Sequence, residues 1–302
     1  MRISKKLSRG NVRMKREELK AKIYARIDEL PTLPTVVHKL LGLMENPKTG
    51  AQDIREAVSH DAALTAKMLK VANSAYYGFP QEISDLERAV ALLGFNMVKS
   101  LAVSVGVINS MPDSKGPSAF SREGLWIHSL AVGTGMKVLA EQCSRKKEGE
   151  SLFIVGLLHD VGKILLDQFF PDYFTRSVEN IRTKEGVFLY QEEREVIGFD
   201  HGEIGGMLLE RWKFPEAIRS SIAFHHYDDL PDDVDESHVS LLRIADAAAQ
   251  ELDLGNSGNV SAPPVDKGDL DRIGVDLNGY QDLKKRLEGA REGIVGFFGL
   301  IS

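Results

Sequence analysis

The stretch Phe153–Lys163 reads FIVGLLHDVGK, an apolar run that ends in a histidine and an aspartate. The run predicts a buried helix segment, so that His159 and Asp160 are the first polar side chains after it. Burying a carboxylate beside an imidazole costs several kcal/mol unless something compensates. Because a divalent cation compensates well, the pair predicts a metal site at the end of this helix.

Helical periodicity surrounds this stretch on both sides. Apolar residues recur at helical spacing after Pro34 and after Asp61, an expected N-cap, and the segment 96–110 is apolar on almost every side. After Ser121, no segment alternates apolar and polar residues for long enough to predict a strand. We therefore expect an all-α fold, with further helices at 126–139, 152–158, 167–182, 203–212, 216–226 and 239–252.

Turn-forming residues divide the chain. The run of breakers from Met111 to Pro117 predicts a boundary between two helical subdomains. Later in the chain, a stretch rich in Gly, Pro, Asn and Asp lacks apolar periodicity, which is typical of a linker. We expect a basic N-terminal arm (1–24), an N-terminal helical half (25–112), a metal-binding helical half (118–252), the linker (253–280) and a C-terminal helix (281–302).

The composition fits an ordinary globular protein. The 302 residues are 43% hydrophobic and 27% charged, which excludes a disordered or collagen-like chain. No apolar stretch approaches the roughly 18 residues that span a bilayer, so we expect no membrane insertion. The lone Cys143 excludes an intramolecular disulfide and favours the reducing cytoplasm. With eight histidines against one cysteine, any metal site must use nitrogen and oxygen ligands.

The charge is unevenly distributed. Residues 1–22 carry nine Lys or Arg and two Glu, so this arm is +7 while the rest of the chain is −13. The body should repel a phosphate backbone, which argues against nucleic-acid binding outside the arm. For the arm itself, a solvated leader and a contact with nucleic acid or an acidic partner are both open.

Five of the eight histidines lie between Trp126 and Tyr227. Beyond them, Asp246 stands in the apolar segment LLRIADAAA (241–249), an expensive place for a carboxylate unless it binds a metal. Taken singly, each histidine has a simpler explanation, such as a core position, a helix end beside the acidic loop 228–233, or a solvent-facing ring. Together they form a candidate ligand set: His128, His159, Asp160, His201, His225, His226 and Asp246.

Two residues after the His–Asp pair add to the expected chemistry. Gly162 is expected to leave space beside the site. Lys163 lies one helical turn after His159, so its ammonium group can reach a phosphate oxygen bound to the metals. Asp160, whose two oxygens could bridge two cations, and Lys163 are therefore the candidate catalytic residues.

The pattern of one histidine, the His–Asp pair and a distant aspartate resembles the HD superfamily of metal-dependent phosphohydrolases. The longer series is similar to the HD-GYP subgroup, although Tyr227–Pro231, YDDLP, stands where a Gly-Tyr-Pro loop is expected. The resemblance implies two divalent cations that the sequence does not identify among iron, manganese, zinc, nickel and magnesium. It implies one cation on His128, His159, Asp160 and Asp246, a second on Asp160, His201, His225 and His226, and a phosphoester contact from Lys163.

The N-terminal half resembles a different branch. Leu30–Pro34 reads LPTLP, Ser59–Gly78 reads SHDAALTAKMLKVANSAYYG and Ala89–Gly94 reads AVALLG. These motifs look like the HDOD domain, and the resemblance covers about residues 25–230. HDOD proteins are bacterial signal-transduction output modules, related to HD hydrolases, in which the ligand set is usually degraded. This sequence keeps the set.

Two functions are consistent with these residues, so enzyme status stays open. The first is an HDOD protein whose di-metal centre hydrolyses a phosphoester or nucleotide. The second is a non-catalytic signalling module that binds a protein partner and whose metal site is structural or sensory. The missing Gly-Tyr-Pro loop puts cyclic dinucleotide hydrolysis in doubt.

Overall fold

The computed structural model describes residues 18–30, 32–44, 51–59, 61–74, 77–79, 81–111 and 121–301. Throughout these ranges the secondary structure is helical, without a β-strand, which confirms the predicted all-α fold. Most of the basic arm and of the breaker run that follows Met111 falls outside the described residues.

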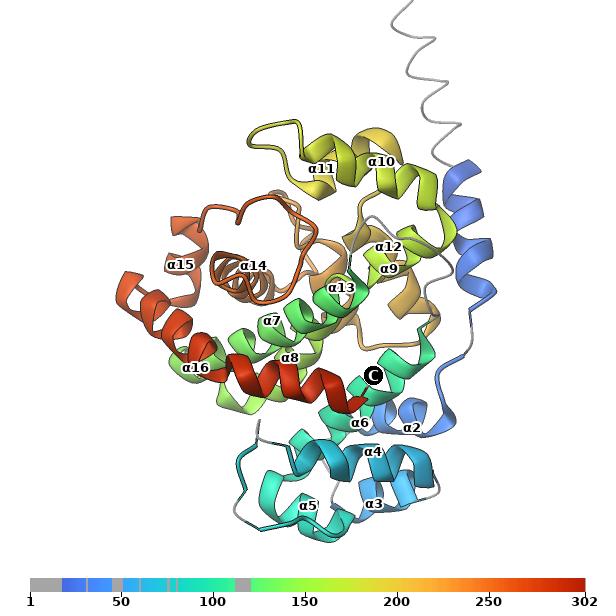
Figure 1. The fold of residues 1–302 in the computed structure, drawn as a ribbon, viewed down its shortest axis with the longest axis vertical. Helices are drawn as coiled ribbons and strands as arrows, with labels where there is room; N and C mark the ends of the chain where they lie inside the picture. Colours follow the sequence, from blue (N-terminus) through green and yellow to red (C-terminus); the bar gives the residue numbers. More distant parts are fainter. Residues whose placement is uncertain are drawn as a thin grey trace, which may run out of the picture.

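The N-terminal half is a cluster of short helices (Figure 1). Side-chain caps start two of them, because Asp61 accepts a hydrogen bond from the Leu64 N–H at 2.9 Å and Asp85 accepts one from the Arg88 N–H at 2.8 Å. Residues 18–28 are helical as well. The helices that follow are α2 (Thr35–Met44), α3 (Ala51–Ser59), α4 (Ala62–Ala72), α5 (Leu86–Leu93) and α6 (Phe95–Ser110).

Helix α6 connects the two halves. Every residue from Val98 to Ile108 is buried, including Lys99, in agreement with a segment that is apolar on almost every side. Its neighbours include α2 and α4 of the N-terminal half and α8 of the second half. The buried apolar side chains of both halves consequently form one connected hydrophobic core.

The second half is built around α7, which packs against α8 and α14. Glycines allow the approach of α8, since a Cβ on Gly156 would lie 2.5 Å from the Gly133 nitrogen. The elements of this half are α7 (Arg122–Gln142), η1 (Lys146–Glu148), α8 (Gly149–Leu158), α9 (Val161–Phe169), α10 (Pro171–Ile181), α11 (Leu189–Val196), α12 (His201–Arg211), α13 (Glu216–Ala223) and α14 (Glu236–Glu251).

The stretch 253–280 differs from the expected linker because it contains helix α15 (Lys267–Ile273). Asp266 caps this helix by accepting a hydrogen bond from the Asp269 N–H at 3.0 Å, and Leu270 is buried. A helix this short offers too few apolar positions for periodicity to reveal it.

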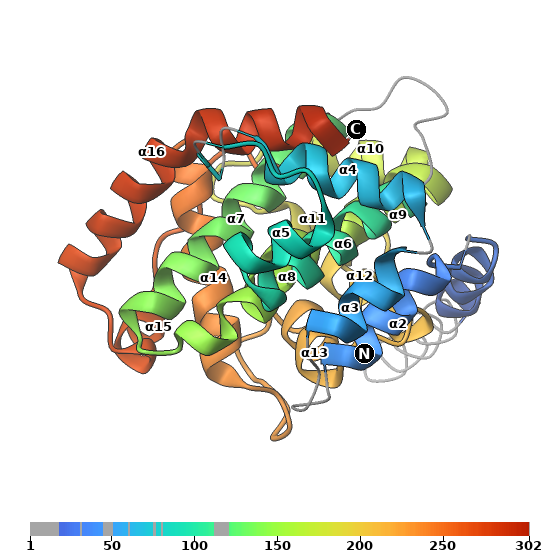
Figure 2. The same cartoon turned by 90° about the horizontal axis from the view of Figure 1, so that it is seen from below.

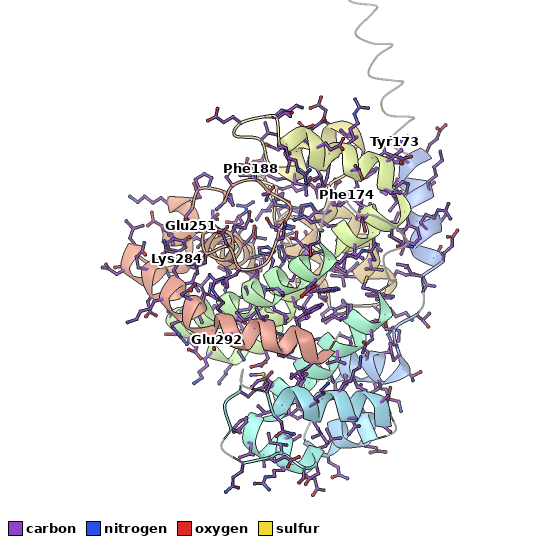
Figure 3. All side chains as sticks on the ribbon, viewed as in Figure 1. Tyr173, Phe174, Phe188, Glu251, Lys284 and Glu292 are labelled. Carbon is purple, nitrogen blue, oxygen red and sulfur yellow. The ribbon has the colours of Figure 1, made fainter. Side chains whose placement is uncertain are left out.

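The C-terminal helix α16 (Leu277–Ile301) begins four residues before the expected start at Gln281. Tyr280, Leu283 and Leu287 recur at helical spacing and are buried. The helix lies along α7 and reaches α4 and α6 of the N-terminal half (Figure 2). An ion pair of 2.9 Å between Lys284 and Glu251 joins it to α14 (Figure 3).

Among the described residues, no single helix is both long and apolar enough to cross a bilayer. Helices α5 and α6 meet the length and composition limits only as a pair, and a bend of 118° separates them.

Candidate metal centre

The second half brings all seven candidate ligands to one place. They come from α7, from the junction of α8 and α9, from the start of α12, from the turn after α13 and from α14. That turn lets two adjacent imidazoles converge, with ring centroids 3.8 Å apart. Six of the seven are at most 8% exposed and His226 is half-buried: His128, His159, Asp160, His201, His225, His226 and Asp246.

The first group of ligands consists of His128, His159 and Asp246. The His128 Nε2 lies 3.0 Å from Oδ1 of Asp246, and the His159 Nε2 lies 3.9 Å from the same oxygen. One ligand atom from each residue lies within 4.8 Å of the other two. Two imidazoles and a carboxylate at this spacing are a donor set that zinc, manganese or iron can use.

The second group of ligands consists of His201, His225 and His226. The Nε2 atoms of His201 and His226 are 2.9 Å apart. Again one ligand atom from each residue lies within 4.8 Å of the others. Three imidazoles from two elements therefore face one point.

Asp160 lies between the two groups and turns one oxygen to each. Its Oδ1 is 3.0 Å from the Nε2 of His201 in the second group. Its Oδ2 is 3.2 Å from the Nε2 of His159 and 3.8 Å from that of His128, both in the first group. Asp160 therefore approaches both groups, and its bridging of two cations, which the sequence resemblance implies, stays a prediction.

Hydrogen bonds from Nδ1 to backbone carbonyls orient two of the imidazoles. His159 donates to the Gly156 carbonyl at 2.7 Å, and His225 donates to the Ile222 carbonyl at 2.6 Å. A carbonyl can only accept, so Nδ1 carries the proton and Nε2 keeps its lone pair. Neither Nε2 makes a well-formed hydrogen bond to a described residue, although both rings are buried. Buried lone pairs without a donor fit bound cations.

The charge states of Asp160, Asp246 and His225 fit the same interpretation. Burial would raise the pKa of Asp160, but the charges of His159 and Lys163 outweigh it and hold that pKa well below its usual range. Burial would also raise the pKa of Asp246, but the interaction with His128 outweighs this effect and lowers that pKa to about 2. Burial lowers the pKa of His225 well below 6.5. Ionised carboxylates and neutral imidazoles are the forms that bind metal ions.

Lys163 was expected to reach a phosphate oxygen, but its surroundings in the structure are different. Its ammonium group is buried and donates to Oδ2 of Asp160 at 2.7 Å and to the Ser257 carbonyl at 2.8 Å. The structure therefore places Lys163 against a ligand and a loop of the expected linker, and not toward an open phosphate position.

A cavity of about 550 Å³ gives access to the centre. His225, His226 and Asp246 form part of its wall, and Tyr190 stacks on the His226 ring with centroids 4.2 Å apart. The loop before α15 and α15 itself close the other side through residues 263–272.

The HDOD domain model matches residues 30–227 of the chain. The chain belongs to the HDOD family. Within this family, an HDOD domain protein of unknown function from Geobacter sulfurreducens has a solved structure with a TM-score of 0.78 and 26% identity, covering 93% of this chain and 98% of that one.

Other known proteins resemble this HDOD protein. A candidate phosphohydrolase from Shewanella amazonensis has a TM-score of 0.71 and 24% identity, over 93% of this chain and 98% of that one, a likeness in fold. An uncharacterized protein of Treponema pallidum is 30% identical over 212 residues, which is 69% of this chain. The matched region spans 40% of that protein's length.

Glu193 is a site residue that the sequence analysis missed. It lies on α11, is fully buried, and its Oε2 accepts hydrogen bonds from the backbone N–H of His201 at 2.9 Å and from Nδ1 at 2.6 Å. Burial alone would lower the pKa of His201, but the charge of Glu193 outweighs it and raises that pKa to about 9. Its position four residues after Leu189, on the buried face of an amphipathic helix, is the signal that could have revealed it.

Gly162 was expected to leave open space beside the site, but it allows a close contact between two helices instead. A Cβ at this position would lie 1.9 Å from the carbonyl oxygen of His201. The place beside the site that was expected to be open is therefore filled by the backbone of α12. The glycine allows α9 and α12 to approach, which brings His201 within reach of Asp160.

Proposed function

We propose that this HDOD protein binds two divalent cations and hydrolyses a phosphoester. The first cation would be held by the first group of ligands and Asp160, and the second by the second group and Asp160. The observation that carries the proposal is the position of Asp160, which turns one carboxylate oxygen to each group. A carboxylate between two clusters of imidazole lone pairs is the arrangement that a pair of cations requires.

The bound cations would supply an acidified water and neutralise charge on the phosphoryl oxygens. The protein residues hold and orient them. Glu193 fixes the ring of His201, and the Gly156 and Ile222 carbonyls fix those of His159 and His225. A phosphoester would enter from the 550 Å³ cavity, where His226 is the most exposed ligand.

The test is hydrolysis of bis(p-nitrophenyl) phosphate by the full chain loaded with Mn²⁺, for the wild type and Asp160→Asn. Asp253→Asn is the matched control, because Asp253 lies in a loop with a φ of 49° that asparagine also adopts. We expect turnover in the wild type and the control and its loss in Asp160→Asn. Turnover that is equal in all three proteins would contradict the proposal.

A second candidate function is a non-catalytic signalling module, and the environment of Lys163 favours it. An ammonium group that binds both Asp160 and the Ser257 carbonyl connects the centre to the loop before α15. In that case the metal site would stabilise the fold or act as a sensor, and the protein would signal by binding a protein partner in the reducing cytoplasm. Bound metal without turnover of phosphomonoesters, phosphodiesters or nucleotides would select this function over the first.

A further inference from the structure

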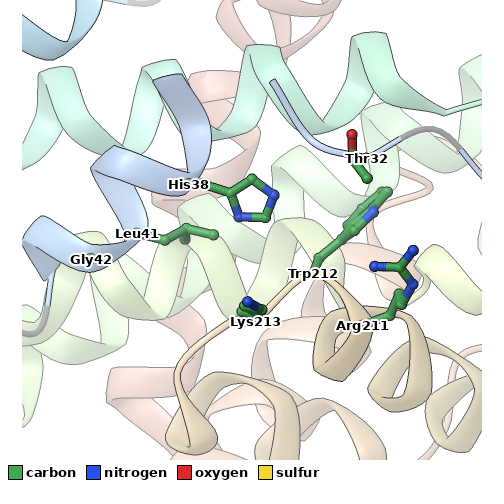
Figure 4. A pocket seen from close by; sticks show the side chains of 7 residues that line it. All are labelled: Thr32, His38, Leu41, Gly42, Arg211, Trp212 and Lys213. Atoms are coloured by element: carbon green, nitrogen blue, oxygen red, sulfur yellow. The ribbon is translucent and has the colours of Figure 1, made fainter. Parts of the chain in front are cut away.

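A second cavity lies between the two halves, away from the metal centre (Figure 4). Its volume is about 460 Å³, and it is open to solvent, because four of its seven lining residues are exposed. One wall comes from the N-terminal half, from Thr32 and α2, and the other from the end of α12 and the residues after it. The lining residues are Thr32, His38, Leu41, Gly42, Arg211, Trp212 and Lys213.

The cavity is basic on one side and apolar on the other. None of its seven lining residues carries a carboxylate, while His38, Arg211 and Lys213 supply nitrogen donors. Arg211 is held by Asp28, with Nε 2.8 Å from Oδ1. Lys213 makes no ion pair with a described residue. The buried side chains of Leu41 and Trp212 form the apolar wall.

Lys213 lines the cavity at the end of α12. Its φ of 58° belongs to the hydrogen-bonded turn that ends this helix, in which the Phe214 N–H donates to the Leu209 carbonyl at 2.9 Å. His38 and Lys213 both line the cavity, and burial together with the charge of Lys213 lowers the pKa of His38. An anion bound in the cavity would offset the positive charge of Lys213.

Gly42 is an exposed residue of α2 that lines the cavity. It lies inside α2, where glycine destabilises a helix by about 0.5–1 kcal/mol relative to alanine. A Cβ at this position would meet nothing within 4 Å, so no neighbour among the described residues requires a glycine there. A side chain at position 42 has room to enter the cavity.

We propose that this cavity binds a small organic anion, with its carboxylate or phosphonate-type head on Lys213, Arg211 and His38 and its apolar body against Trp212 and Leu41. The anion would contact both halves at once. It would also contact the end of α12, the helix that begins with His201. Eleven residues of helix, about 16 Å, separate this site from the metal centre, so a bound anion is placed to act on the position of α12.

The experiment uses the full chain after EDTA treatment, so that it is independent of any metal at the other site. Trp126→Phe leaves Trp212 as the remaining tryptophan of the two in the sequence, and its fluorescence reports on the cavity wall. The probes are benzoate and phenylphosphonate, with benzamide and benzylammonium as neutral and cationic counterparts. Calorimetric titration of the wild-type chain gives the same affinities without the substitution.

We expect millimolar binding of benzoate, phenylphosphonate or both, and binding about tenfold weaker or absent for the other two probes. Lys213→Gln should weaken anion binding about tenfold and Gly42→Leu should abolish it. Lys39→Gln on the exposed face of α2 and Gly289→Leu on α16, where a Cβ meets nothing within 4 Å, are the matched controls. Absence of anion binding, or anion binding that Lys213→Gln and Gly42→Leu leave unchanged, would overturn the proposal.

Discussion

Glu193 binds His201 twice, through the backbone N–H and through Nδ1 of the ring, and both residues are buried. The carboxylate thereby fixes the ring so that Nε2 faces Asp160 at 3.0 Å. Carboxylate–histidine pairs of this kind are common behind metal ligands, where they set the tautomer and raise the basicity of the imidazole.

Removing this carboxylate should weaken metal binding at the second group. We expect Glu193→Gln to lower the affinity there by about 10–100-fold, measured by calorimetric titration with Mn²⁺ or Zn²⁺. Glu195→Gln on the same helix is the control, since the Glu195 side chain is 72% exposed. If both variants bind metal as the wild type does, Glu193 has no role in ligand orientation.

The metal-free protein should show a pH dependence that arises from the same pair. The folded-state pKa of His201 is raised from 6.5 to about 9, so its contribution to stability is complete below pH 6.5 and is lost as pH rises to about 9. We expect a loss of roughly 3 kcal/mol in the free energy of unfolding, measured with urea in the presence of EDTA. Glu193→Gln should flatten this decrease, and an unchanged decrease in that variant would refute the assignment.

Below about pH 6.5, a fall in pH should lower the stability of the metal-free protein, because two other histidines then titrate. The folded-state pKa values of His225 and His226 are lowered well below 6.5 by burial, so the unfolded chain takes up protons first as pH falls. The metal-free protein should therefore lose stability below about pH 6.5. Bound Zn²⁺ should reduce that loss, because it holds both imidazoles in the neutral form until protons displace it. Urea unfolding with and without Zn²⁺ measures the difference.

Lys163 should stabilise the metal-free protein by neutralising Asp160. Lys163→Met leaves a buried carboxylate without its closest cation, at a cost of about 3–5 kcal/mol. Added Mn²⁺ should restore part of this loss, because a metal ion then supplies the positive charge. The melting temperature with and without Mn²⁺ tests this, with the exposed Lys147→Met as control. A loss of stability that metal does not reduce would separate Lys163 from the centre.

Gly162 should tolerate no side chain. A Cβ 1.9 Å from the His201 carbonyl forces α9 and α12 apart, so we expect Gly162→Ala to lower stability by about 1–3 kcal/mol and to reduce bound metal. Gly289→Ala meets nothing within 4 Å and should be neutral or stabilising by up to about 1 kcal/mol. Equal stability of the two variants, measured by urea unfolding, would contradict the close contact.

The sequence alone was sufficient to predict the features that depend on the local pattern of apolar and polar residues. Helical periodicity predicted the all-α fold, and the burial cost of the His159–Asp160 pair identified the position around which the other ligands gather. The resemblance to HD and HDOD proteins then supplied the ligand set that the fold brings together.

Features that depend on contacts between distant elements were not predicted. Glu193 stands in the sequence QEEREV, which looks like a solvated helix face until α11 packs against the start of α12. Lys163 was expected to contact a phosphate oxygen, but its ammonium group donates to the Ser257 carbonyl, which is 94 residues later in the chain. The role of Gly162 likewise depends on the position of a carbonyl on another helix.

The central claim is that two cations share Asp160. Crystals of the wild-type chain grown with Mn²⁺ and measured for anomalous scattering test it most directly. We predict two peaks, one within ligand distance of His128, His159 and Asp246 and one within ligand distance of His201, His225 and His226, with an oxygen of Asp160 on each. Fewer than two peaks at these groups, with Mn²⁺ present in excess, would contradict the shared pair of cations.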